Sequence, residues 1–287
     1  MNTSARKPEE WDLVIKPRDR WYQLDLGTIW EYKDLLFLLV RRDFISQYKQ
    51  TVLGPIWLII QPVLTTIIYS IIFGLIARIG TDQIPPLLFY LSGLTLWSYF
   101  SDCFIKTSNI FIANSSIFGK VYFPRLIVPL SVLVSNLIKL AIQLLLFLVV
   151  WFYYNFTNPS FHPNLIYIVF LPILIIMMAG LGLGFGILVS SLTTKYRDLT
   201  FLVGFGVQLL MYASPIVYPM SLVPEKYKII VLLNPLTSII EGFKFMFLGT
   251  GIWSWTSLLY SFSFMTILIL FSLIVFKKVE KTFMDTV

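Results

Sequence analysis

Six long apolar stretches constrain this chain more than any other feature of its sequence. A helix that crosses a membrane needs roughly 20 largely apolar residues, and each stretch approaches or exceeds that length. The predicted spans are Leu53–Ala77, Leu87–Phe104, Leu126–Tyr154, Leu165–Leu192, Leu199–Val217 and Ile252–Phe276. We therefore predict an all-α membrane protein with six transmembrane helices.

Composition excludes the main alternatives to a membrane protein. Of the 287 residues, 57% are hydrophobic and only 13% are charged, whereas a soluble domain carries about 25% charged residues. Intrinsic disorder requires the opposite composition, with low hydrophobicity and high charge. Cys103 is the only cysteine, so a disulfide scaffold within one chain is also excluded.

The distribution of positive charge predicts the orientation in the membrane. Lys and Arg number nine before the first span, three in 106–125, two in 193–198 and three after Phe276, against four on the opposite face. Because positive residues accumulate on the cytoplasmic side, we place both termini in the cytoplasm. The net charge of +7 then reflects orientation and lipid contact rather than nucleic-acid binding. The predicted organisation is a cytoplasmic arm with an interfacial helix (1–51), a transmembrane domain (52–276) and a cytoplasmic tail (277–287).

An amphipathic helix is predicted ahead of the first span. Thr28 and Glu31 form a capping-box pattern that opens a helix running to about Tyr48. One sector of its helical wheel carries charge, and the opposite sector is apolar. The charged sector contains Glu31, Asp34, Arg41 and Arg42, and the apolar sector contains Ile29, Tyr32, Leu36, Leu39 and Val40. Such a helix would lie at the cytoplasmic membrane surface with its apolar side toward lipid; an ordinary surface helix is the alternative.

A re-entrant helical hairpin is predicted at about 226–249, between the fifth and sixth spans. Ile229–Leu233 and Ile239–Leu248 are apolar but too short to cross a membrane, and Asn234 and Pro235 separate them. Irregular backbone at membrane depth is tolerated only where it is buried in protein or lines a water-filled cavity. The hairpin therefore predicts a polar path nearby.

Several kinds of catalytic chemistry lack the residues that they need. The sequence contains no G-x-x-x-x-G-K-[ST] phosphate-binding loop. His162 is its only histidine, which excludes a histidine metal cluster and a His-dependent triad. The glycines at 180, 182, 184 and 186 lie inside a span, at a spacing that favours close helix packing over phosphate binding. We predict that the chain is not an enzyme and holds no metal or cofactor of its own.

Ionisable residues at membrane depth are rare and mark candidate functional sites. Asp102 and Lys106 are four residues apart on the second span, where they would neutralise each other. Lys139 lies midway along the third span and requires a partner, a wet cavity or a shifted span boundary. Glu241 and Lys244 lie in the second half of the hairpin, where they would line a polar path or contact lipid headgroups.

Polar and aromatic residues recur at helical spacing on two spans. On the first span the series is Trp57, Gln61, Thr65 and Tyr69, and on the fifth it is Gln208 and Tyr212, with Tyr218 beyond. A helix face gains nothing from glutamine in lipid, so these faces should point at protein or water. Aromatic rings beside amides suit sugars, whereas plain helix–helix packing is the alternative.

Short motifs recur in a fixed order among the six predicted spans, from about Asp34 to Gly249. The motifs are Gln47–Trp57 with Gln61 and Pro62, Tyr90–Leu94 with Trp97, Asn109–Asn114, Val121–Arg125, Lys195–Asp198, Ala213–Pro219 and Asn234–Leu236. Each motif is weak alone, but their order among the spans is fairly specific. Together they resemble ABC-2-type permeases of bacterial polysaccharide exporters, with O-antigen permeases the most similar and teichoic acid and capsule exporters related.

The resemblance implies a homodimer of permeases with two separate ATPase subunits, which bind ATP and Mg²⁺, docked beneath it. A channel between the permeases would pass an undecaprenyl-linked polysaccharide across the bacterial inner membrane. The channel-lining residues would be Trp57, Gln61, Thr65, Tyr69, Gln208, Tyr212, Tyr218, Asn234 and Glu241. The residues that couple to the ATPase would be Ser116, Phe118, Lys120, Tyr122 and Arg125. Lys33, Arg41, Arg42 and Lys49 would meet the lipid pyrophosphate, with ordinary anchoring at the membrane surface as the alternative.

Three other functions remain open at this point. A drug or small-lipid exporter of the same superfamily would share the fold but would not depend on Gln61 and Tyr212 for glycan export. A membrane-embedded glycan enzyme such as a ligase would work without an ATPase and would depend on Glu241. An ion-coupled transporter normally requires several intramembrane charges and internal repeats, and the sequence contains few of either.

Overall fold

The computed structural model describes residues 26–49, 51–114, 118, 123–157, 162–193, 196 and 198–284. Within these ranges every regular element is helical. The helices are α1 (Leu26–Glu31), α2 (Lys33–Tyr48), α3 (Trp57–Tyr69), α4 (Pro86–Ser108), α5 (Ile110–Ala113), α7 (Ile127–Thr157), α8 (Leu171–Thr193), α9 (Leu199–Tyr212), α10 (Glu225–Leu233), α11 (Pro235–Leu248) and α12 (Trp255–Met284). Short turns of helix, η1 (Gly54–Ile56), η2 (Ser70–Ile76), η3 (Leu165–Phe170) and η4 (Met220–Leu222), extend or join them.

Four of the described helical segments are long and apolar enough to cross a membrane. They are Gly54–Ile76, Ile127–Thr157, Leu165–Thr193 and Trp255–Val279, and they correspond to the predicted spans one, three, four and six. The prediction of an all-helical membrane protein is confirmed for the described residues. α9 has only 14 residues and ends at Tyr212 rather than Val217, because the chain turns before Pro215. The count of six spans and the cytoplasmic location of the termini stay predictions.

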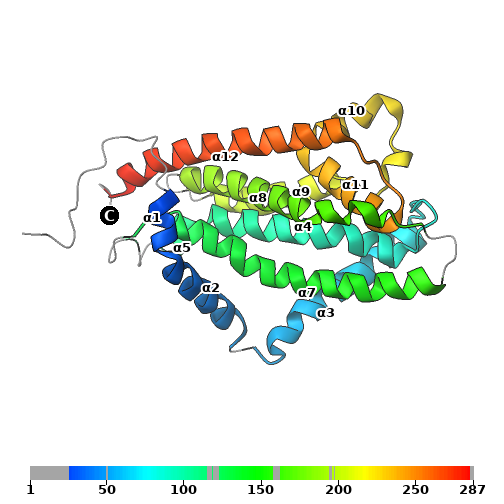
Figure 1. Cartoon of the computed structure of the whole chain (residues 1–287), viewed down its shortest axis with the longest axis horizontal. Helices are drawn as coiled ribbons and strands as arrows, with labels where there is room; N and C mark the ends of the chain where they lie inside the picture. The colour runs from blue at the N-terminus through cyan, green and yellow to red at the C-terminus, as the bar shows by residue number, and fades with distance from the viewer. Residues whose placement is uncertain are drawn as a thin grey trace, which may run out of the picture.

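The long helices form one bundle with α8 between α4 and α12 (Figure 1). Four glycines on α8 allow this close packing. A Cβ atom on Gly182 would lie 2.8 Å from the Cβ of Cys103, and one on Gly186 would lie 2.5 Å from the Cβ of Thr107, both on α4. Gly180 and Gly184 face Met265 and Leu268 of α12 in the same way. The predicted packing role of these glycines is confirmed.

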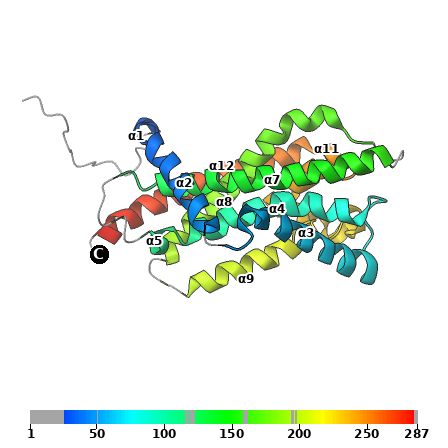
Figure 2. The ribbon, with the colours of Figure 1, turned by 90° about the horizontal axis from the view of Figure 1, so that it is seen from below.

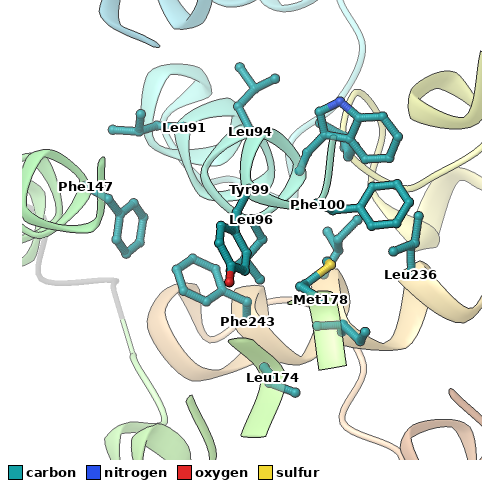
Figure 3. Close-up of a cluster of buried hydrophobic side chains, with 14 of the residues drawn as sticks. Leu91, Leu94, Leu96, Tyr99, Phe100, Phe147, Leu174, Met178, Leu236 and Phe243 are labelled. Carbon is teal, nitrogen blue, oxygen red and sulfur yellow. The ribbon is translucent and has the colours of Figure 1, made fainter. Parts of the chain in front are cut away.

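The main core lies where α4, α7, α8 and α11 meet (Figure 3). Phe147 of α7 packs against Phe243 of α11, with ring centroids 5.2 Å apart. Leu96 and Phe100 of α4 are fully buried in the same cluster. The core therefore holds α11 firmly against three long helices.

The predicted break in the re-entrant hairpin is confirmed. α10 and α11 are bent by 103°, and the Asn234 side chain at the bend accepts a hydrogen bond from the Leu236 amide, as an N-cap does. The two halves differ, because α10 has no buried residue whereas all of α11 except Phe245 is buried. The insertion of this pair into the bilayer from the outer side stays a prediction.

The N-terminal helix packs on the bundle in a way that the sequence did not predict. The chain forms two helices with a break at Tyr32, and Thr28 has no described side chain. Leu39 and Val40 of α2 are buried, and Leu39 lies in a cluster with Ile127 and Phe276. The expectation that the apolar side faces lipid is therefore wrong at these positions. The predicted charged sector, Glu31, Asp34, Arg41 and Arg42, is exposed as expected.

Candidate functional site

Three polar side-chain pairs join α4 and α7, from the buried Gln143 at one end to the exposed Lys106 at the other. These helices run antiparallel, so residues farther along α4 meet residues earlier in α7. The pairs are Ser98 Oγ to Gln143 Oε1 at 2.6 Å, Lys139 Nζ to Asp102 Oδ2 at 2.7 Å, and Lys106 Nζ to Asn136 Oδ1 at 2.9 Å. We call this set the α4–α7 ladder. It satisfies polar groups that would otherwise be costly among apolar helices.

The α4–α7 ladder shows that the predicted pairing of Asp102 with Lys106 is wrong and identifies the partner of Lys139. Asp102 does not pair with Lys106 but forms a salt bridge with Lys139. Lys139 therefore has the partner that its position in an apolar span requires. Asn136 and Gln143 were not predicted as site residues, although they recur with Lys139 at helical spacing on one face of α7. That periodicity was the signal that could have found them.

The polar residues of α3 and α9 lie on the outside of the single chain. Gln61, Gln208, Trp57 and Tyr212 are exposed, and α9 lies at the edge of the bundle (Figure 2). Tyr69 is partly buried, and its hydroxyl lies 3.6 Å from Met211 Sδ of α9, which joins α3 to α9. We call this exposed side of the two helices the α3–α9 face.

The buried side of α9 explains why its polar residues point outward. Val203, Val207 and Met211 are its only buried residues, and they recur every four residues along one stripe. On α3, the predicted Thr65 is half-buried, and its hydroxyl donates to the Gln61 carbonyl oxygen of its own helix at 2.9 Å. Packing within one chain does not cover the amides of Gln61 and Gln208.

A turn after α9 connects it to α4 and α11. Lys244 Nζ donates to the Pro215 carbonyl oxygen at 2.5 Å, and Asn234 Nδ2 donates to Ser214 Oγ at 2.8 Å. Ile216 lies against Gly93 of α4, where a Cβ would come within 3.1 Å of Ile216 Cγ2. Asn234, predicted to line a channel, thus has two structural contacts in this chain. Tyr218 follows this turn and is half-buried.

Glu241 and Lys244 lie inside the protein and not on a polar path. Their side chains are 3% and 1% exposed, and Glu241 Oε1 lies 3.9 Å from Lys244 Nζ. The Lys244 ammonium also lies 3.7 Å from the ring centroid of Phe89. Glu241, predicted to line a polar path or to contact lipid headgroups, is therefore buried beside Lys244 within this chain.

An aromatic cluster fills the end of the molecule that carries α2 and α5. Phe118 is 6% exposed and packs against Phe111 and Phe123, and Phe111 stacks on Phe276 of α12 at 5.0 Å. The Arg125 guanidinium lies 5.4 Å from the Phe118 ring centroid. Of the other predicted coupling residues, Ser116, Lys120 and Tyr122 lie outside the described residues.

The predicted basic residues of the N-terminal helix are exposed. Arg42 pairs with Asp43 at 2.7 Å, and Lys33 lies 5.7 Å from the Trp30 ring. Arg41 and Lys49 are exposed as well. Among the residues that the structure describes, no three His, Cys, Asp or Glu side chains lie together as a metal site would need.

Comparison with known proteins adds to this geometry. Residues 34–248 match the model of a family described as ABC-2 type transporter. The chain is 32% identical to the O-antigen export system permease protein RfbA of Klebsiella pneumoniae over 254 residues, which cover 88% of this chain and 94% of that protein. It is 26% identical to the protein of the same name from Myxococcus xanthus, covering 76% of this chain and 82% of the other. It is 27% identical to the polysialic acid transport protein KpsM of Escherichia coli, covering 72% and 78%.

Proposed function

Because the chain belongs to the ABC-2 type transporter family, we propose that it is the channel-forming permease of a polysaccharide exporter in the bacterial inner membrane. The proposed substrate is a lipid-linked glycan of the O-antigen type, carried on undecaprenyl. ATP hydrolysis on a separate subunit would drive its export. Teichoic acid or capsule export is the related alternative.

The observation that carries this proposal is the extent of the match to named export permeases. The Klebsiella O-antigen permease aligns along 94% of its own length, so the two chains share the whole permease and not one module. A capsule-type relative, the polysialic acid transport protein, matches less closely and over less of its length. These relatives support an O-antigen-type glycan ahead of a capsule.

The α3–α9 face supports a homodimer with a channel between its two copies. Exposed amides such as Gln61 and Gln208 are unfavourable against lipid. A second copy, or water held between two copies, would solvate them. Trp57, Tyr212 and the amides would then offer weak ring and hydrogen-bond contacts to passing sugars, and weak contacts suit a chain that must keep moving.

The aromatic cluster around Phe118 supports coupling to an ATPase. The segment that contains Phe118 connects α5 to α7, and its ring packs on Phe111, which stacks on Phe276 of α12. Leu39 of α2 belongs to the same cluster. A displacement of this segment by a bound ATPase would therefore be transmitted to α2, α5 and α12. The ATPase can bias the permease only by binding two of its states with different affinity.

Purification from the native host tests the proposal. We expect a nucleotide-binding subunit to copurify in a 2:2 complex, and glycan export by reconstituted vesicles to require ATP. Export by the permease alone, with no nucleotide, would contradict the proposal.

Two variants separate the remaining alternatives. Replacing Gln61 and Tyr212 together by alanine should reduce glycan export, whereas a drug or small-lipid exporter would leave glycan export unchanged. A glycan enzyme would lose turnover with Glu241→Ala even without an ATPase. The burial of Glu241 beside Lys244 instead predicts that this variant loses stability before it loses any chemical step.

A further inference from the structure

A polar cavity lies between the N-terminal helix and the bundle, separate from the α3–α9 face. It has a volume of about 220 Å³ and is bounded by α2, by Leu58 of α3, and by residues of α4 and α7. The polar side chains that matter here are Gln47, Tyr48, Lys106, Ser135, Asn136 and Lys139. A single water needs only about 15 Å³ measured in this way, so the space is large enough for a polyatomic group.

The charges around this cavity do not cancel. Lys139 is paired with Asp102, and Asp43, which also lines the cavity, is paired with Arg42. Lys106 has no carboxylate partner among the described residues, and its ammonium donates only to the neutral amide oxygen of Asn136. The cavity therefore carries an excess positive charge from Lys106.

The cavity also contains more hydrogen-bond donors than acceptors. The Ser135 hydroxyl is buried with no hydrogen-bond partner in the described structure, which is costly for a polar group. Burial raises the pKa of the Tyr48 phenol, and the nearby Asp102 carboxylate raises it further, so Tyr48 keeps its proton and remains a donor. An anion with several acceptor oxygens would satisfy the ammonium and both hydroxyls.

The position of the cavity along α7 indicates where this anion comes from. α7 has 31 residues and is about 46 Å long, which exceeds the roughly 30 Å thickness of the hydrocarbon core. Lys139 lies about 18 Å from the start of α7, so it lies about 10 Å inside the hydrocarbon boundary on the predicted cytoplasmic side. Val132, which also lines the cavity, lies about 8 Å from the start of α7 and therefore at this boundary. The cavity thus reaches the level of the lipid headgroups, and basic pockets between membrane helices on the cytoplasmic side bind such headgroups.

We propose that this cavity binds the phosphate headgroup of a lipid in the cytoplasmic leaflet, with Lys106 as the main counter-charge. The Ser135 and Tyr48 hydroxyls donate to the remaining phosphate oxygens. An anionic phospholipid and a polyprenyl diphosphate share this chemistry. The proposal does not depend on the transported substrate or on an ATPase.

Lipid titration of the purified, delipidated permease in detergent tests this proposal. Phosphatidylglycerol and undecaprenyl diphosphate are titrated separately, with zwitterionic phosphatidylcholine as the comparison lipid. Lys106→Gln removes the charge and keeps a donor, and we expect it to weaken anionic-lipid binding by roughly tenfold, the effect of losing one charge-assisted hydrogen bond. The matched control is Lys226→Gln on α10, an exposed lysine far from the cavity, which should leave binding unchanged.

The outcomes distinguish the two lipids and test the site itself. Weaker binding of phosphatidylglycerol alone assigns the cavity to a resident phospholipid, whereas weaker binding of the diphosphate alone assigns it to a carrier lipid. Weaker binding of both supports a general phosphate site. If Lys106→Gln does not fold, Ser135→Ala and Tyr48→Phe are compared with Lys226→Gln in the same titration, and we expect them to weaken lipid binding by less than tenfold. The proposal is overturned if no anionic lipid binds, or if the cavity variants bind as tightly as Lys226→Gln.

Discussion

Three glutamines on three helices differ in burial and in hydrogen bonding. Gln143 of α7 is 4% exposed and accepts a hydrogen bond from Ser98 of α4. Gln61 of α3 and Gln208 of α9 are exposed and have no side-chain hydrogen bond to another described residue. The glutamine amide is thus hydrogen-bonded inside the bundle at one position and is exposed without a side-chain partner at the two others.

The exposed side of α7 is apolar, unlike the exposed side of α3 and α9. Leu145, Val149 and Phe152 are its exposed residues along two turns, and all three are apolar. A face of this kind suits lipid chains, whereas a face with two amides does not. Exposure in the single chain therefore favours contact with lipid at α7, whereas our proposal places water or a second copy of the chain at α3 and α9.

The largest expected effect concerns glycines on α8 and α9. Gly182→Leu would drive a side chain into Cys103 and the backbone of α4, whereas the space within 4 Å of a Cβ on Gly204 is empty. Extra methylenes in a packed core cost about 1–3 kcal/mol, but here the Cβ alone already clashes and leucine adds three more carbon atoms, so we expect an exceptional loss of more than about 5 kcal/mol. We expect Gly182→Leu to accumulate poorly or melt far earlier, and Gly204→Leu to fold normally but to impair dimer formation and export.

Thermal unfolding in detergent, together with size-exclusion chromatography, measures both variants. Equal destabilisation by the two substitutions would place α9 in a packed interior and would contradict its assignment to an exposed face.

The next largest effect concerns the buried pair on α11. Lys244→Met leaves Glu241 buried without its cation, which we expect to cost about 3–5 kcal/mol. The matched control is Lys228→Met on α10, which removes a salt bridge to Glu225 whose carboxylate is 87% exposed and should cost less than about 1 kcal/mol. Chemical denaturation of both variants gives the two costs, and a small loss for Lys244→Met would argue against the buried pair.

A smaller difference in stability is expected between substitutions of the buried and the exposed glutamines. Gln143→Leu removes the hydrogen bond to Ser98 and should cost about 1 kcal/mol. Gln208→Leu should leave the stability of the single chain within about 0.5 kcal/mol, as surface substitutions usually do. Melting temperatures of the two variants test this difference. A loss for Gln208→Leu as large as that for Gln143→Leu would indicate that Gln208 has a partner within its own chain.

Local sequence patterns predicted several parts of this structure correctly. Asn234 and Pro235 predicted the break between α10 and α11, because an N-cap and a proline at the first helical position are local signals. The alternating glycines of α8 predicted close packing, because small side chains are needed wherever backbones approach. The charged sector of α2 followed from helical periodicity alone.

Features that depend on tertiary pairing were not predictable in the same way. The spacing of Asp102 and Lys106 favoured an ion pair within one helix, but the antiparallel contact of α4 with α7 gives Asp102 a better partner in Lys139. Glu241 was expected on a polar path. Its burial could not be predicted, because it depends on how α11 packs against α4. Leu39 and Val40 were expected in lipid, and only the fold shows that α2 packs on α7 and that both residues are buried.

Water accessibility of the α3–α9 face distinguishes a water-filled channel from a surface that faces lipid. Cys103 is fully buried, so a cysteine placed at Gln61 or Gln208 would be the only exposed thiol, and Leu145→Cys on the apolar face of α7 is the matched control. With a water-soluble maleimide applied to the protein in membranes, we predict labelling at positions 61 and 208 and none at 145. If positions 61 and 208 resist labelling as position 145 does, the face is not in contact with water and the proposed channel is contradicted.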